Sequence, residues 1–263
     1  MNKQQTISKP VSLKGVGIHS GNEVNLTFKP ANEDFGYAFC RTDLPGNPII
    51  EADVNYVVST ERGTTLEKNG VNIQTSEHVL AALTGLEIDN VLIEIDASEP
   101  PIMDGSSKFF VEALIDAGIE EQSKDRNEYV VKEIISYHDE ESGSDITVLP
   151  ADSYEVTAMV DFGTKILGTQ NATMKNLNEF KDNFSNARTF SFLHEIEMLV
   201  DNGLIKGVDL NNAIVYVDKE LDEETMSKLK KAFNKDKISV KPNGILDNLT
   251  LHYPNEAARH KLL

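Results

Sequence analysis

Glu77 and His78 are adjacent at the expected start of a helix, and His260 and Lys261 lie near the end of the chain. Together these side chains offer a carboxylate base, two imidazole ligands and a cation. They are residue types found in hydrolytic zinc centres, where three protein ligands and a water surround the metal. On a helix, adjacent side chains point about 100° apart. His78 can therefore bind a metal while Glu77 reaches a water beside it.

Each of these residues also has a simpler interpretation. Glu77 can merely favour the positive end of its helix, with His78 on the surface. Basic residues such as His260 and Lys261 are often just solvated, and local spacing alone favours these simpler interpretations. A carboxylate ligand one turn after His260 would fall beyond Leu263. We therefore expect weak zinc binding and little activity from these 263 residues alone.

Composition narrows the class of protein. The chain has 263 residues, of which 40% are hydrophobic, enough for one large or two ordinary globular domains. A net charge of −18 argues against nucleic-acid binding, which needs a basic surface. We expect no transmembrane segment, because no apolar stretch approaches roughly 20 residues. The single cysteine, Cys40, excludes an internal disulfide and indicates a reducing compartment, so we expect a cytoplasmic protein.

In the first half, hydrophobic periodicity predicts a sheet covered by two helices. Val24, Leu26 and Phe28 alternate with polar residues, as in a half-buried strand over 21–29. Asn69-Gly70 is typical of a hairpin turn. Ser76 can cap a helix that runs to about Leu86. Further strands are predicted over 36–41, 62–66, 71–73 and 90–95, and a second helix over 107–117, with Gly118 ending it.

The second half shows a similar order of elements. Strands are predicted over 129–137, 145–149, 154–162, 213–217 and 238–241. Helices are predicted over 177–184, 192–202 and 221–233, with Gly203 ending the second of them. Asn255 can cap a last helix, and Glu256 can favour its positive end.

We therefore predict an α+β protein of two similar two-layer domains, each a β-sheet packed on a pair of helices, with the active site between them. The polar segment 120–127 makes the best boundary, which divides the chain into 1–122 and 128–263. The first domain carries Glu77 and His78. The second, whose C-terminal part we expect to be missing, carries Thr189, His260 and Lys261.

Six motifs in a fixed order carry more information than any one of them. They begin at Gly15, Thr75, Ile88, Pro101, Ala187 and Ala258, and they read GVGIHSG, TSEH, IDN, PIMDGS, ARTF and ARHK. The series closely resembles the UDP-3-O-acyl-N-acetylglucosamine deacetylases (LpxC), from about residue 3 to the last residue. The resemblance implies a cytoplasmic Zn²⁺-dependent amidase that removes the N-acetyl group from UDP-3-O-acyl-N-acetylglucosamine in lipid A biosynthesis.

The resemblance also implies roles for individual residues. His78 and His260 match two zinc ligands, and Glu77 matches the general base. Thr189 matches a hydroxyl that holds the oxyanion, and Lys261 matches a cation that contacts the substrate. The aromatic side chains of Phe162 and Phe190 match substrate contacts, and His19 lies in the glycine-rich turn near the substrate entrance.

Residues without a match are expected to be structural. His138, His194 and His252 are interpreted as surface or structural histidines, Asp104 as a turn residue, and Asn90 as a buried amide that binds backbone groups. The family's pattern continues with an aspartate ligand and a later histidine acid that this sequence does not contain. Val208 stands where the family often has a second glycine.

Other functions stay open at this point. The chain can be a non-catalytic sugar-nucleotide binding module, a different zinc hydrolase on the same scaffold, or a structural interaction protein. In some bacteria this unit is fused to a hydroxyacyl-carrier-protein dehydratase, so a longer parent protein is conceivable.

Overall fold

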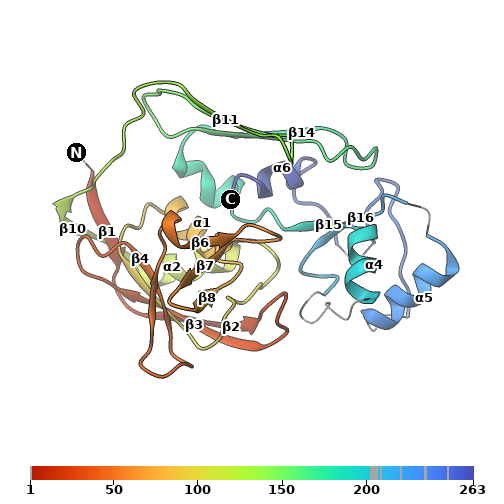
Figure 1. The fold of residues 1–263 in the computed structure, drawn as a ribbon, viewed down its shortest axis with the longest axis horizontal. Coiled ribbons are helices and arrows are strands. Elements are labelled where there is room, and N and C mark those ends of the chain that lie inside the picture. Colours follow the sequence, from red (N-terminus) through yellow and green to blue (C-terminus); the bar gives the residue numbers. More distant parts are fainter. Residues whose placement is uncertain (1, 202–206, 208, 220, 234–235, 248) are drawn as a thin grey trace.

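A five-stranded mixed sheet forms the centre of the first half of the computed structural model (Figure 1), which describes residues 2–201, 207, 209–219, 221–233, 236–247 and 249–263. Its order is β2-β3-β9-β4-β5, and only β4 and β9 are parallel. The strands are β2 (Val11–Val16), β3 (Glu23–Pro30), β4 (Tyr37–Arg41), β5 (Ile49–Glu51) and β9 (Val91–Ile95). The alternation in β3 is confirmed, because Val24, Leu26 and Phe28 are fully buried.

Two helices pack against each other and against this sheet, as predicted. They are α1 (Glu77–Gly85) and α2 (Lys108–Ala117). The Phe110 ring of α2 meets Phe28 of β3 edge-on at a centroid distance of 6.3 Å. Gly118 ends α2 with a φ of 76°, a value that glycine adopts readily.

The predicted Asn69-Gly70 hairpin is confirmed. It joins β7 (Thr65–Lys68) to β8 (Val71–Ile73), and β6 (Val57–Ser59) completes a three-stranded sheet. Asn69 and Gly70 have φ values of 54° and 78°, as a type I′ turn requires. β7 begins later than predicted, because residues 61–63 form a bend in which Arg62 has a φ of 59°.

The polar segment 120–127 is mostly a strand. β10 (Ile119–Asp125) pairs antiparallel with β1 (Lys3–Ile7), which the sequence patterns missed. The Asn90 amide supports this pair by donating to Gln4 Oε1 and Gln122 Oε1. Residues up to Asp125 therefore belong structurally to the first half, and the division into two domains stays a prediction.

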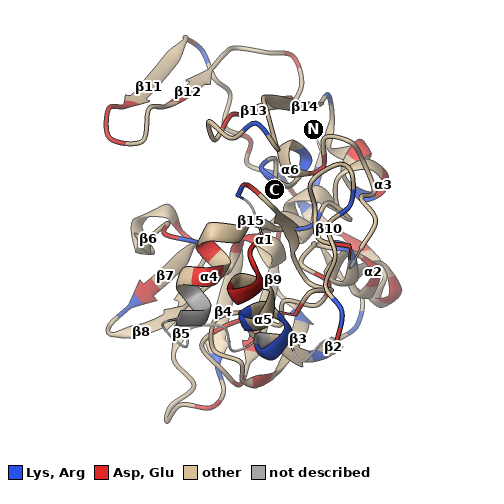
Figure 2. Cartoon of the chain, turned by 90° about the vertical axis from the view of Figure 1, so that its right-hand side faces the viewer, with Lys and Arg blue, Asp and Glu red and all other residues tan. Residues whose placement is uncertain are grey.

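The described residues of the second half form three separate two-stranded sheets. β11 (Ile135–Asp139) pairs with β12 (Ser144–Val148), β13 (Val156–Val160) with β14 (Gln170–Met174), and β15 (Phe190–Phe192) with β16 (Ile214–Tyr216). Figure 2 shows the β11–β12 hairpin projecting from the rest of the chain, and nearly all its residues are exposed. The predicted repetition of the first half's plan is not confirmed.

Helices of the second half follow the prediction with corrections at their ends. A 3-10 turn (Leu177–Glu179) leads into α3 (Phe180–Asn183), and α4 (Leu193–Asp201) and α5 (Glu223–Ala232) follow. Gly203, predicted to end α4, lies outside the described residues. The strand predicted over 238–241 is wrong, since only an isolated bridge joins Val240 to Leu246. The last helix is α6 (Glu256–His260).

One hydrophobic core extends across both halves. The cluster that contains the first sheet also contains Phe180 and Ala258. A Cβ on Gly85 of α1 would lie 2.0 Å from the Phe180 ring, so the absence of a side chain there permits this contact. The fold is therefore mixed α+β, with α6 packed against β13 and β14. No helix in the described part of the chain is long and apolar enough to cross a membrane.

Candidate active site

The start of α1 fixes the Glu77 carboxylate. Ser76 occupies the N-cap position, but its hydroxyl donates to Thr64 O at 3.0 Å instead of capping the helix. The Thr64 N–H in turn donates to Glu77 Oε2 at 2.8 Å. Gly63 lies against this carboxylate, because a Cβ built on it would be 3.2 Å from Glu77 Oε1. Half-buried Glu77 therefore has one oxygen held by the backbone of the preceding loop.

His78 is buried, with 4% of its surface exposed. Its backbone carbonyl accepts a hydrogen bond of 2.9 Å from the Ser107 hydroxyl, which ties α1 to the start of α2. Its ring Nε2 is buried and has no hydrogen-bond partner. A buried polar atom without a partner is uncommon and often indicates an unrecorded ion or water. The alternative interpretation of His78 as a surface residue is therefore wrong.

α6 presents His260 from the second half. Asn255 occupies its N-cap position, yet the Asn255 amide donates to Asn171 O at 2.8 Å and makes no cap bond. The Arg259 guanidinium lies over the Tyr253 ring, with Cζ 4.0 Å from the centroid. His260 Nδ1 is 3.1 Å from Ala187 O. Because a carbonyl can only accept, Nδ1 carries the proton and Nε2 keeps its lone pair.

The two histidines meet at the contact between the halves of the chain. The ring centroids of His78 and His260 are 5.2 Å apart, with the planes inclined by 60°. Burial lowers the pKa of His78, against the attraction of Glu77 and Asp104. Burial, together with neighbouring His78, lowers the pKa of His260 to about 3. Both imidazoles are therefore neutral near pH 7, the form that binds metal ions.

This pair fits two ligand positions of a zinc site. The Nε2 atom of His78 has no hydrogen-bond partner, and that of His260 keeps its lone pair because Nδ1 binds Ala187 O. Ala187 O thus orients the His260 ring, as an outer-shell acceptor does in histidine metal sites. Within the part of the chain that the structure describes, no group of three or more His, Cys, Asp or Glu residues forms a complete metal site.

Thr189 lies in a short segment that docks on the first half. Its N–H donates to Gly105 O at 2.7 Å, and its carbonyl accepts from Ile214 N at 2.9 Å. Gly105 has a φ of 85°, and a Cβ on it would be 2.1 Å from Asn212 O. The predicted turn around Asp104 is confirmed, because Asp104 accepts from the backbone N–H and hydroxyl of Ser106.

An aromatic cluster continues from the histidine pair. Phe190 lies 6.4 Å from the His260 ring and 5.6 Å from the Phe162 ring, centroid to centroid. The exposed Lys261 places its Nζ 5.8 Å from the Phe190 centroid. Phe162 is 45% exposed, so its alternative interpretation as a core residue is wrong.

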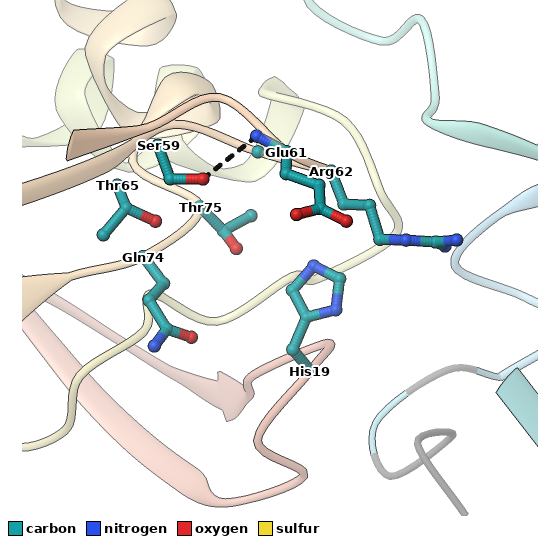
Figure 3. Close-up of a pocket in the computed structure, with 8 residues that line it drawn as sticks. His19, Ser59, Glu61, Arg62, Thr65, Gln74 and Thr75 are labelled. Atoms are coloured by element: carbon teal, nitrogen blue, oxygen red, sulfur yellow. Dashed lines mark hydrogen bonds between the residues drawn. The ribbon is translucent and has the colours of Figure 1, made fainter. Parts of the chain in front are cut away.

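A pocket of about 230 Å³ adjoins the Glu77 loop (Figure 3). His19 points towards Glu61 in this view, with Gln74 on the far side of the pocket. Gly63, which lies against the Glu77 carboxylate, and Thr75, which precedes α1, also line it.

Glu99 holds two walls of this pocket together and was missed from the sequence. It is fully buried. It accepts from the backbone N–H groups of His19 and Ser20 at 2.9–3.2 Å, and from the Thr75 hydroxyl at 3.1 Å. A Cβ on Gly17 would lie 2.4 Å from its Oε2, so the glycine-rich turn must be free of a side chain there. No local pattern distinguishes Glu99 from a surface acid.

The residues that matched no site position have the surface or structural places expected of them. His138, His194 and His252 are exposed, as expected of surface residues. The Asn90 side chain is buried and accepts from Gly36 N at 2.9 Å. Cys40 is buried in β4, and burial raises its pKa.

Comparison with known proteins gives one consistent family. The sequence profile of the family described as "LpxC: UDP-3-O-acyl N-acetylglycosamine deacetylase" matches residues 4–238. A "Bifunctional enzyme LpxC/FabZ" of Chlorobaculum tepidum is 46% identical over 263 residues, which cover 99% of this chain and 56% of that protein. A "UDP-3-O-acyl-N-acetylglucosamine deacetylase" of Geotalea uraniireducens is 38% identical over 261 residues, which cover 99% of this chain and 76% of that protein.

A further relative agrees. The protein of the same name from Myxococcus xanthus is 37% identical over 262 residues, covering 99% of this chain and 75% of that protein. The chain spans little more than half the length of the bifunctional relatives, 56% and 57% in Chlorobaculum tepidum and Bacteroides thetaiotaomicron.

Proposed function

This chain belongs to the UDP-3-O-acyl-N-acetylglucosamine deacetylase family, and we propose that it is the deacetylase unit of an enzyme of lipid A biosynthesis. Its substrate is then UDP-3-O-acyl-N-acetylglucosamine, and the reaction hydrolyses the acetamide bond. The observation that carries this proposal is the contact between His78 and His260, with His78 Nε2 buried and unpartnered.

His78 and His260 would hold Zn²⁺ through their ring nitrogens. When bound, zinc would supply Lewis acidity, which eases deprotonation of water near neutral pH and stabilises negative charge on a carbonyl oxygen. The neutral state of both rings supports this assignment, because a protonated imidazole has no lone pair to offer.

Glu77 is the proposed general base. It follows Ser76 at the N-terminus of α1, next to His78, and the Thr64 N–H binds its Oε2. This hydrogen bond restricts rotation of the carboxylate while the other oxygen stays available to take a proton from water. Water then attacks the acetamide carbon, the leaving nitrogen takes up the proton that came from the water, and the C–N bond breaks. Acetate and the sugar amine are the products.

Thr189 and Lys261 are the proposed stabilisers of the oxyanion. The backbone of Thr189 is bound on both sides, to Gly105 and to Ile214, so its side chain starts from a fixed position. Lys261 lies over the edge of the aromatic cluster, within 5.8 Å of the Phe190 centroid. A positioned donor and a cation act most strongly where water is excluded.

Phe162, Phe190 and His19 are the proposed substrate contacts. The exposure of Phe162 supports a binding role over a packing role. His19 lines the pocket beside the Glu77 loop, and Arg62 adds a cationic side chain to the wall. A cytoplasmic location, indicated by the single cysteine, stays a prediction.

The test is acetate release by the purified whole natural polypeptide from synthetic UDP-3-O-acyl-N-acetylglucosamine, with and without a zinc chelator. We expect activity that the chelator removes and Zn²⁺ restores, and that Glu77→Gln lowers by about 10²–10⁴-fold. A protein that binds UDP but holds no zinc would instead be a binding module. Turnover of other N-acyl sugars alone would indicate a different zinc hydrolase.

We also propose that the complete protein carries a second unit, a hydroxyacyl-carrier-protein dehydratase. Relatives that match the chain over 263 residues at 46% and 41% identity are named bifunctional LpxC/FabZ enzymes. Relatives at 38% and 37%, and one at 41% over 222 residues, are named deacetylases alone. The mass of the natural polypeptide and a dehydratase assay test this. A natural protein with the mass of a single deacetylase would contradict it.

A further inference from the structure

Arg188 and Glu256 form a buried ion pair beside the histidines. Their exposed fractions are 7% and 0%. Arg188 Nε is 2.8 Å from Glu256 Oε1, and Arg188 Nη2 is 3.2 Å from Glu256 Oε2. This forked contact fits the planar guanidinium, and a lysine has no equivalent of it. Glu256 lies in the first turn of α6, as predicted, but its carboxylate also pairs with Arg188.

The two residues lie in the segments that carry the proposed site. Arg188 stands between Ala187, whose carbonyl meets His260 Nδ1, and Thr189. Glu256 begins α6 and is one turn before His260, so both side chains lie on neighbouring parts of one helix face. The pair therefore joins the segment of Ala187 and Thr189 to the helix of His260.

Both carboxylate oxygens of Glu256 accept hydrogen bonds, and the network also binds the segment 250–252. Besides the guanidinium, Glu256 accepts from Arg188 N at 3.2 Å and from His252 N at 2.7 Å. Arg188 Nη2 also donates to Thr250 O at 2.7 Å. The network thus fixes residues 187–189, 250–252 and 256–260 relative to one another.

A buried ion pair of this kind fixes the orientation of the segments that carry it more than it adds to the free energy of unfolding. Removing two charges from water is costly, and an apolar pair of similar volume is often as stable or more stable. α6 has only five residues and no side-chain cap, so its orientation depends on its contacts with other segments, of which this buried ion pair is one. We propose that Arg188 and Glu256 are positioning residues that aim the His260 ring and the Thr189 segment at the site. This inference rests on the proposed function.

The test compares three variants of the whole natural polypeptide. Glu256→Gln replaces one carboxylate oxygen with an NH₂ group, which faces the N–H donors of Arg188 and His252 and cannot accept from them. The double variant Arg188→Met/Glu256→Leu replaces the ion pair with apolar side chains. Arg126→Gln is the matched control, because Arg126 binds Glu87 and Asp89 in the loop between α1 and β9. For each, we would measure the Zn²⁺ dissociation constant by chelator competition, the Co²⁺ absorption spectrum and thermal unfolding.

We expect Glu256→Gln to weaken Zn²⁺ binding by up to about 10–100-fold, the range for a residue that directly orients a metal ligand, because Glu256 acts on His260 through α6 and Arg188. The double variant should recover thermal stability only in part, because the N–H groups of Arg188 and His252 lose their acceptor. It should not recover Zn²⁺ affinity, and its Co²⁺ spectrum should stay altered. Arg126→Gln should lose stability alone. If Zn²⁺ affinity recovers along with stability, or if the control loses it equally, the pair is only structural. A wild-type protein without zinc affinity would instead overturn the proposed function.

Discussion

His78 and His260 come from the first and last helices of the described chain, yet their ring centroids are 5.2 Å apart. If both histidines bind zinc, His78→Gln and His260→Gln should each weaken Zn²⁺ binding by at least about 100-fold. Substituting a residue that only orients a ligand has a smaller effect. Metal analysis and chelator competition measure this. His138→Gln, an exposed histidine on β11, is the control and should bind Zn²⁺ normally. Normal binding by His78→Gln would refute the assignment.

Glu77→Gln should separate chemistry from metal binding. The amide can still accept from Thr64 N at the position where Oε2 accepts it at 2.8 Å, so the fold should be retained. We expect kcat to fall about 10²–10⁴-fold with KM and zinc content little changed, because only the base is lost. Glu67→Gln on β7 is the control. A kcat within threefold of the control's, in steady-state assays, would exclude Glu77 as the base.

At Thr189 the hydroxyl can be removed without disturbing its backbone bonds to Gly105 and Ile214. Thr189→Ala should lower kcat about 10²–10³-fold, the usual effect of losing an oxyanion donor. Thr189→Ser keeps the hydroxyl and should retain most of the activity. Equal losses in the two variants would show that the methyl group, and hence packing, is what matters.

Gly105 should tolerate no side chain. Its φ of 85° strains any other residue, and a Cβ would lie 2.1 Å from Asn212 O. Gly46 has a similar φ of 80° with nothing within 4 Å, so Gly46→Ala has the strain without the clash. We expect Gly105→Ala to lower the free energy of unfolding by about 1–3 kcal/mol more than Gly46→Ala does. Urea unfolding measures the difference, and equal losses would contradict the clash.

Without metal, acid should destabilise the fold through the buried histidines. The pKa of His260 is about 3 in the folded state against 6.5 for an ordinary histidine. Between these values the unfolded chain binds the extra proton, so stability is full above pH 6.5 and falls as pH decreases. The loss approaches about 1.4 kcal/mol per pH unit for each such group. Unfolding in chelator from pH 7.5 to 5 tests this.

The control for that experiment is a pair of variants. His260→Asn keeps a donor for Ala187 O but cannot titrate, so it should flatten the pH dependence. His138→Asn removes an exposed histidine and should leave the pH dependence unchanged. An unchanged slope in His260→Asn would show that other groups cause the acid sensitivity.

Local patterns predicted the elements whose signals are local. The apolar face of α2, with Phe110, Val111 and Leu114 buried, and the Asn69-Gly70 turn are confirmed from sequence. β10 was missed, because its exposed and polar residues show no alternation and its pairing with β1 is a long-range choice. β12 was predicted to within one residue, and the predicted turn at Gly143, with a φ of 67°, is confirmed. The strand predicted over 129–137 is mostly wrong, because β11 begins only at Ile135.

Some residues of the candidate site were predictable from local motifs, and others only from the fold. Motif order predicted Glu77, His78, Thr189 and His260 as site residues, but the contact of His78 with His260 depends on how the two halves pack. Glu256 looked like an ordinary helix-start acid, and only the fold brings Arg188 to it. Glu99 has three donors from two distant segments, and no local pattern could reveal them.

Because one imidazole comes from each half, an ion bound between them would add its binding free energy to the packing of the whole molecule. An ion that binds only the folded protein raises its free energy of unfolding by RT ln(1 + [L]/Kd), where [L] is the free ion concentration. Zinc supply would then govern how long the folded enzyme survives as well as how fast it works. A cell short of the metal would lose the protein itself to unfolding and proteolysis.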